Sequence, residues 1–267
     1  MLSVVPPIAR MQPYGIDHFI VLGITVALIV VVPLAVRRAR DTRRTERLIT
    51  LAGWALLVIT LLWLGWGMLP AHWNIGESLP FHFSDALRIA TAIALITRSG
   101  WAVGVSFFWG LTLNLQTLIT PNLNYYDAPV LEFAMYWLLH IAALLAPIVL
   151  VWGLGYRPTW SGYGATIALT ISWAALALAA NAVTGANYGY LSRAPEGPSI
   201  LDVLGPWPVY ILWEAALVAV VWACMTLPWT TRAARASAPV VDRLGLIRRK
   251  RQCEPTPLPT VGERVAR

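Results

Sequence analysis

Residues 16–36 read IDHFIVLGITVALIVVVPLAV, and the arginine-rich sequence RRARDTRRTER follows directly at residues 37–47. The first segment is almost wholly apolar, and about twenty apolar residues let a helix cross the hydrocarbon core of a bilayer. A second apolar segment, residues 48–69, follows the arginines. Two such segments joined by a basic turn predict a pair of antiparallel membrane-spanning helices.

The composition extends this interpretation to the whole chain. Of its 267 residues, 58% are hydrophobic and 12% are charged, whereas soluble domains carry about 25% charged residues. The mean hydropathy is +0.63. A net charge of +7 would suggest a nucleic-acid partner for a soluble protein, but basic residues between apolar segments are explained by membrane topology. We therefore expect membrane lipids, and not nucleic acid, as partners.

Seven apolar stretches are candidates for membrane spans. The third is short and carries charge, so its assignment depends on its neighbours. The predicted fold class is all-α, a polytopic membrane protein with seven transmembrane helices in one domain, residues 16–228. The stretches cover residues 16–36, 48–69, 82–98, 101–120, 131–152, 163–184 and 207–227.

Basic residues alternate strictly between the two ends of these spans. Seventeen lie in alternate connections and in the C-terminal tail, and the opposite side carries Arg10 and Arg193. Because basic loops stay cytoplasmic, this predicts an outer N-terminal segment, residues 1–15, and a cytoplasmic C-terminus in a bacterial inner membrane. The first apolar run ends in arginines without a small-residue cleavage site, so we expect no cleaved signal.

The tail, residues 229–267, is basic and rich in Pro and Ala, and we expect it to be disordered. Its run Arg248-Arg249-Lys250-Arg251 is expected to touch anionic headgroups. The two cysteines, Cys224 and Cys253, lie at the predicted cytoplasmic side, where a structural disulfide is not expected.

The polar residues inside the apolar stretches fall at one depth. Charge in a bilayer costs about 2.5–3.5 kcal/mol per residue, so each is a candidate functional residue. Their shared depth predicts a polar pocket open toward the outer leaflet, above an apolar floor. These residues are Asp85, Arg88, Asn114, Gln116, Glu132, His140, Asn181 and Glu214.

Helical spacing sorts further side chains onto shared faces. The third span begins at residue 82, and His82 shares a face with Asp85, as Ser84 does with Arg88, because residues three or four apart are neighbours on a helix. Glu132, Tyr136 and His140 form one stripe about 12 Å long. Asn181, Asn187 and Tyr188 share a face if the sixth span continues to residue 188, and Glu214 needs a partner such as Arg88 or His82.

Metal and cofactor motifs are weak. The histidines show no paired spacing, so a zinc site built from His82, Asp85 and His140 has little support from the sequence. There is no G-x-S-x-G sequence and no phosphate-binding loop. We predict no metal and no cofactor.

In the segments that carry the polar residues described above, and over roughly residues 15–228, the chain resembles the YwaF-like family of bacterial seven-span membrane proteins. That family is distantly related to a eukaryotic transmembrane acyltransferase, which moves fatty-acyl chains between phospholipids through a cysteine nucleophile. The resemblance implies a nucleophile near the start of the third span, where this chain has Ser84 and no cysteine. The matching segments are residues 79–82 with Asp85, 108–116, 120–121, His140, Asn181, 187–191, 197–199 and 205–208.

Three functions are compatible with these residues. In the first, an intramembrane acyltransferase or lipid hydrolase, Ser84 is the nucleophile, His140 is the base, Glu132 or Asp85 orients it, and Arg88 or Asn114 stabilises negative charge.

In the second, the same pocket binds or transports a lipid or a small molecule without catalysis, and the uniformly apolar inner half favours a one-sided pocket over a channel. Its binding residues would be His82, Asp85, Arg88, Asn114, Gln116, Tyr136, Asn181, Asn187, Tyr188 and Glu214. In the third, the polar layer serves only helix packing.

Overall fold

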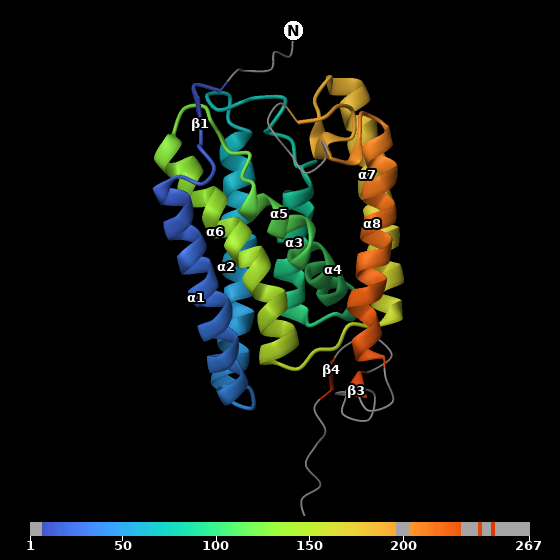
Figure 1. The fold of residues 1–267 in the computed structure, drawn as a ribbon. Coiled ribbons are helices and arrows are strands. Elements are labelled where there is room, and N and C mark those ends of the chain that lie inside the picture. The colour runs from blue at the N-terminus through green and yellow to red at the C-terminus, as the bar shows by residue number, and fades with distance from the viewer. Residues whose placement is uncertain (1–6, 196–202, 231–239, 242–246, 249–267) are drawn as a thin grey trace, which may run out of the picture.

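A computed structural model describes residues 7–195, 203–230, 240–241 and 247–248. Residues 197–199, Cys253 and most of the tail, including residues 249–251, lie outside this description. The described helices run side by side along one long axis, with α3, α4 and α5 in the middle of the bundle (Figure 1). The helices are α1 (Ile16–Ala39), α2 (Arg43–Gly67), α3 (Phe83–Thr97), α4 (Gly100–Leu111), α5 (Leu113–Ile119), α6 (Pro129–Ile148), η1 (Val149–Gly153), α7 (Trp160–Thr184), η2 (Tyr188–Tyr190), α8 (Val209–Thr226) and η4 (Leu227–Trp229).

Six helical segments of the described chain are long and apolar enough to cross a membrane. The third predicted span corresponds to α3, which has 15 residues and so measures about 22 Å, less than the roughly 30 Å of a hydrocarbon core. α3 packs against α2, α4 and α6, and Leu87, Ala92 and Ala94 are fully buried. It is an interior helix. The seven-span count and the orientation in the membrane stay predictions.

The fourth predicted span is broken in the structure. Residues 100–119 form two helices, α4 and α5, which meet at Thr112 with φ −119° and ψ −78°. The hydroxyl of Thr112 donates to the Phe108 carbonyl, and a threonine that bonds back to the preceding turn bends a helix. The indole of Trp222 on α8 donates to the same hydroxyl at 3.0 Å. Hydrophobicity alone did not reveal this break.

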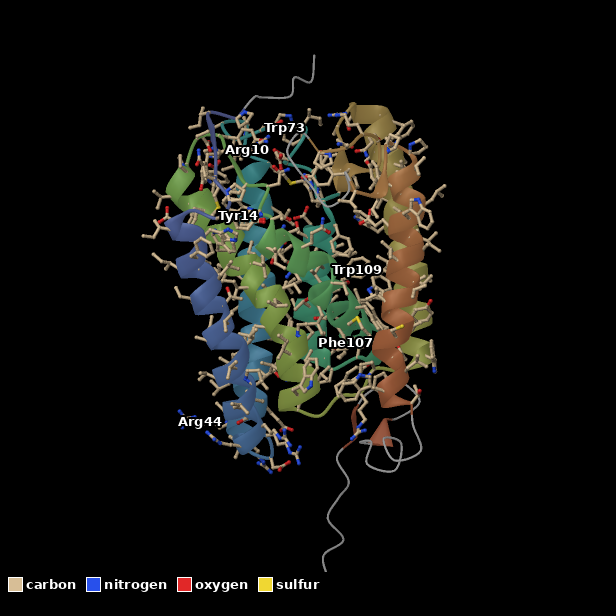
Figure 2. All side chains as sticks on the ribbon, viewed as in Figure 1. Arg10, Tyr14, Arg44, Trp73, Phe107 and Trp109 are labelled. Carbon is tan, nitrogen blue, oxygen red and sulfur yellow. The ribbon has the colours of Figure 1, made fainter. Side chains whose placement is uncertain are left out.

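Glycines bring the central helices into close contact. A Cβ added at Gly104 of α4 would lie 3.3 Å from Gly162 Cα of α7, and one at Gly110 would lie 2.7 Å from the Ala143 carbonyl oxygen of α6. Small residues allow this approach in membranes, where dispersion contacts between helices replace the hydrophobic effect. Trp109, the neighbour of Gly110 in α4 (labelled in Figure 2), is fully buried, and its indole donates to the Thr170 hydroxyl of α7 at 2.9 Å.

Two pairs of short strands occur beside the predicted helices. β1 (Ala9–Arg10) pairs antiparallel with β2 (Asn124–Tyr125), so the segment before α1 is tied to the segment before α6. In the tail, β3 (Val240–Val241) pairs with β4 (Ile247–Arg248). These additions arise because backbone N–H and C=O groups outside helices pair with each other.

The two ends of the bundle differ. One end, here called the loop face, carries residues 7–15, 68–82, 120–128 and 185–195; the opposite end, the arginine face, carries residues 37–47, 98–99 and 154–159. Arg10 is labelled at the loop face and Arg44 at the arginine face (Figure 2). Every predicted site residue lies nearer the loop face, because α3, α6 and α8 begin there and α5 and α7 end there.

Candidate functional site

The first turns of α3 carry two of the most buried charged residues in the described chain. Asp85 and Arg88 are 3% and 6% exposed, and their side chains form an ion pair. Arg88 also donates from Nε to the Ser84 carbonyl at 2.9 Å and from a terminal nitrogen to Ser84 Oγ at 3.3 Å. The i to i+3 and i to i+4 spacing of a helix brings these groups together. The Asp85 carboxylate and the Ser84 hydroxyl therefore both contact the Arg88 guanidinium.

His140 enters the same region from α6. Its Nδ1 lies 2.7 Å from the Tyr136 carbonyl oxygen. A carbonyl can only accept, so Nδ1 carries the proton and Nε2 presents a lone pair. Within the described chain Nε2 has no hydrogen-bond partner, although the residue is only 7% exposed. α3 and α6 pack against each other. The predicted groups of α3 and α6 therefore lie on helices that pack together, and no hydrogen bond in the described residues joins them directly.

Asn114, in the first turn of α5, completes this group. Its amide nitrogen donates to the His140 carbonyl at 3.0 Å, so it ties α5 to the backbone that carries the imidazole. Its Oδ1 is fully buried and has no hydrogen-bond partner in the described residues. A buried acceptor without a partner costs about 1–3 kcal/mol. Ser84, Asp85, Arg88, Asn114 and His140 are called the polar cluster from here on.

Glu132 makes different contacts from those expected. Both of its carboxylate oxygens accept from the Tyr126 backbone N–H, at 3.2 and 3.1 Å, and one also accepts from the Asp127 N–H at 3.4 Å. The predicted stripe along α6 exists, but no hydrogen bond joins Glu132 to His140 in the described chain. Tyr136 donates its hydroxyl to the Thr117 carbonyl at 2.8 Å. Glu132 therefore fixes the loop before α6 and does not orient the imidazole.

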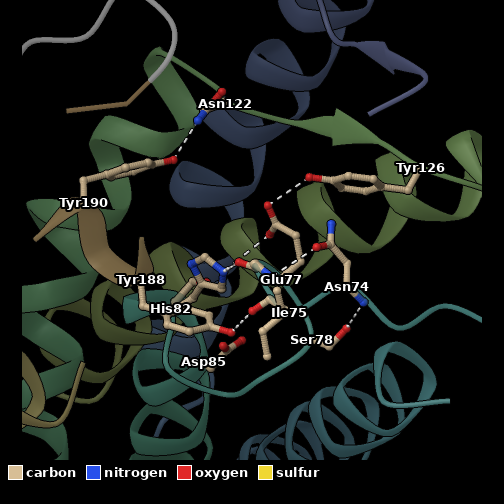
Figure 3. Close-up of polar contacts among 12 residues, drawn as sticks. Asn74, Ile75, Glu77, Ser78, His82, Asp85, Asn122, Tyr126, Tyr188 and Tyr190 are labelled. Atoms are coloured by element: carbon tan, nitrogen blue, oxygen red, sulfur yellow. Dashed lines mark hydrogen bonds and ion pairs between the residues drawn. The ribbon is translucent and has the colours of Figure 1, made fainter. Parts of the chain in front are cut away.

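Residues 68–82, called the cap segment, connect α2 to α3 at the loop face. His82 lies 3.0 Å from the Gly76 carbonyl oxygen and 3.4 Å from a Glu77 carboxylate oxygen. Glu77 also accepts from the Tyr126 hydroxyl at 3.1 Å. Figure 3 shows Asp85 beneath this network. The cap segment therefore closes the loop-face end of α3, and the sequence did not reveal the roles of Glu77 and Tyr126.

Tyr188 connects the cap segment to α7. The hydroxyl donates to the Ile75 carbonyl, and the backbone N–H and C=O of Tyr188 bond to the Asn181 side chain at 2.7 and 3.1 Å. The side chain is fully buried, and burial raises its pKa to about 12; a hydrogen bond with the Leu79 backbone lowers the pKa by less, and the Glu77 and Asp85 charges add smaller increases. The phenol is therefore a neutral hydrogen-bond donor at physiological pH. Asn181 and Tyr188 are close, as predicted, but a loop and not a continued helix brings them together.

The remaining predicted residues lie apart from the polar cluster. Asn187 binds its own loop, accepting from the backbone N–H groups of Ser192 and Arg193. Gln116 and Glu214 are half-buried and make no side-chain hydrogen bond or ion pair in the described residues. The expected pairing of Glu214 with Arg88 or His82 is not formed, because Arg88 pairs with Asp85.

No group of three metal-ligating side chains lies close together in the part of the chain that the structure describes. His82 bonds within the cap segment and His140 to its own helix, so the two imidazoles serve different contacts. A hollow between α2 and α6 is apolar, and no residue of the polar cluster lines it. It is lined by Ile59, Leu62, Trp63, Trp66, Leu131 and Met135.

The six long apolar helical segments of the described chain define an integral multi-pass membrane protein. The comparison with family models then identifies the chain more closely. It belongs to the TMEM164 family, whose model matches residues 13–226. No curated protein and no solved structure matches the chain. The matched region runs from the start of α1 to the end of α8 and so contains the whole polar cluster.

Proposed function

We propose that this protein is a membrane-embedded lipid acyltransferase or lipid hydrolase, with Ser84 as nucleophile and His140 as general base. The observation that carries the proposal is the fixed tautomer of His140. Its protonated Nδ1 is held by the Tyr136 carbonyl, so the lone pair of Nε2 is available to accept a proton. The resemblance to the YwaF-like family and its acyltransferase relative points to the same chemistry.

The surroundings of Ser84 support a nucleophilic role. Ser84 lies in the first turn of α3, where the helix dipole favours negative charge. The Arg88 guanidinium, 3.3 Å from Oγ, would stabilise the charge that develops on this oxygen or on a substrate oxyanion. Asp85 holds Arg88 in place.

In the proposed reaction, Ser84 Oγ attacks the carbonyl carbon of a lipid ester and passes its proton to His140 Nε2. The ester C–O bond breaks, and the departing lipid alcohol takes the proton from His140. A second lipid alcohol, or water, then attacks the acyl-serine in the same way. Ser84 and His140 are not hydrogen-bonded to each other in the described residues, and catalytic hydrogen bonds of this kind often form only when substrate binds.

The second candidate function is lipid binding without catalysis. The observation that favours it is the position of Glu132, whose carboxylate bonds to backbone N–H groups of residues 126 and 127. Among the described residues the Tyr136 carbonyl, and no carboxylate, hydrogen-bonds to the His140 imidazole, unlike the arrangement in a hydrolytic triad. In this alternative Arg88 and Asn114 would bind polar groups of a lipid.

The two functions are separated by measuring turnover. The purified full-length chain is reconstituted in nanodiscs that contain phospholipid with deuterated acyl chains and unlabelled lysophospholipid, and acyl exchange and fatty-acid release are followed by mass spectrometry. We expect turnover by the wild type, loss of at least a hundredfold in Ser84→Ala and His140→Ala, and residual activity in Ser84→Cys, because a thiol is also a nucleophile.

The matched control is Ser172→Ala on α7, where the exposed hydroxyl bonds to its own helix; this variant should retain wild-type turnover. Turnover that persists in Ser84→Ala would refute the assignment of the nucleophile. Saturable lipid binding with no turnover by the folded wild type would support the binding function instead.

A further inference from the structure

The turn between α1 and α2 concentrates positive charge at the arginine face. Six arginines occur within residues 37–47, against two acidic residues, Asp41 and Glu46. All six are exposed. Arg40 pairs with Asp41 at 3.7 Å, and Glu46 interacts with Arg98 of the neighbouring turn. The other five form no ion pair with the described residues: Arg37, Arg38, Arg43, Arg44 and Arg47. These five are called the arginine turn.

The position of the arginine turn is set by the apolar helices beside it. Leu34 of α1 and Leu48 and Leu51 of α2 are 47%, 56% and 62% exposed, as expected of side chains that face lipid tails. The arginines begin directly beyond Val36 and end directly before Leu48. Their guanidinium groups therefore lie where the apolar belt ends, which is the level of phospholipid headgroups.

Interactions within the described protein compensate these charges only at the end of α1, where Arg37 and Arg38 lie at the negative end of the helix dipole. Arg43 and Arg44 stand in the first turn of α2, where the positive end of the helix dipole disfavours a cation. The five side chains also repel one another because they lie on the adjoining ends of α1 and α2. The cap of α2 is already made by Thr42, whose hydroxyl accepts from the Thr45 N–H at 3.2 Å. An external anion would relieve this repulsion.

Arginine is suited to one kind of anion in particular. Its planar guanidinium donates two parallel hydrogen bonds to a phosphate, whereas lysine acts as a point charge. All six basic residues of residues 37–47 are arginine, as are nineteen of the twenty basic residues of the chain, so this surface presents only planar guanidinium groups. We propose that the arginine turn binds the phosphate groups of anionic phospholipids in the leaflet at the arginine face. This surface is independent of the proposed function of the polar cluster.

The experiment is native mass spectrometry of the full-length chain in detergent, titrated with phosphatidylglycerol and, separately, with phosphatidylcholine. A basic residue at a membrane surface contributes about a fivefold change in affinity for anionic lipid. Arg43→Gln combined with Arg44→Gln should therefore raise the Kd for phosphatidylglycerol by about 25-fold. Binding of phosphatidylcholine should be weak and unchanged.

Two further variants make the result interpretable. Arg43→Lys with Arg44→Lys keeps the charge, and therefore the topology, but removes the planar fork, so we expect an intermediate loss of affinity. Arg193→Gln removes one exposed charge at the loop face and should leave binding unchanged. Equal affinity for the two lipids, or an unchanged Kd in the glutamine pair, would overturn the proposal. So would loss of binding caused only by replacing Arg248, Arg249 and Arg251 in the tail.

Discussion

Replacing Gly110 by alanine tests the contact that positions the polar cluster. The added Cβ would lie 2.7 Å from the Ala143 carbonyl oxygen and 3.0 Å from Pro147 Cγ. Ordinary contact begins at 3.4 Å, and a helix carbonyl cannot rotate away, so α4 must move from α6 by about 0.7 Å. Such overpacking costs about 1–3 kcal/mol. The same shift stretches the 3.0 Å bond from Asn114 to the His140 carbonyl, which is worth about 1 kcal/mol.

Alanine favours a helix over glycine by about 1 kcal/mol, so the net loss in the free energy of unfolding is about 2 kcal/mol. At about 2–4 °C per kcal/mol, the melting temperature in detergent, followed by tryptophan fluorescence, should fall by about 4–8 °C. The control is Gly23→Ala in α1, where the new Cβ meets nothing within 4 Å; it should leave stability unchanged or raise it. Equal shifts in both variants would refute the close contact between α4 and α6.

Two other predictions concern buried polar groups. Asp85→Asn leaves the Arg88 guanidinium buried without a counter-ion and should lower the free energy of unfolding by about 3–5 kcal/mol. The double variant Asp85→Asn/Arg88→Met should restore much of this loss. Thermal unfolding measures both variants, and a loss below about 1 kcal/mol in the single variant would contradict the ion pair. Burial raises the pKa of Tyr156 to about 12, so the folded state holds this proton more tightly and stability falls as pH rises from about 10 to about 12, by about 2–3 kcal/mol. Unfolding curves across this range should show a smaller decline in Tyr156→Phe, and identical declines would contradict the assignment.

Much of the helical framework could be predicted from the sequence. The apolar stretches from residue 16 to residue 227 each correspond to helix, because a long apolar run has few alternatives inside a bilayer, where every backbone polar group must be bonded internally. The break at Thr112 could not be predicted. It depends on a hydroxyl that bonds to the preceding turn and to Trp222 of a helix 110 residues away.

The candidate site was predictable to a different degree for each residue. Asp85 and Arg88 are three apart on one helix, so their pairing follows from helical geometry. The stripe of Glu132, Tyr136 and His140 also follows from spacing, but the partner of each member does not. Glu132 bonds to backbone N–H groups in the loop before α6, and a loop conformation is not encoded by helical periodicity.

The sequence by itself determined which segments are helical, where basic turns alternate along the chain, and which polar side chains share a helix face. These are consequences of apolar length, charge and the 3.6-residue period, all of which act locally. The tertiary structure alone decided that α3 is an interior helix, that Asn114 holds the His140 backbone, and that Glu214 pairs with neither Arg88 nor His82. These outcomes depend on how closely helices approach, which small residues such as Gly110 allow but do not specify.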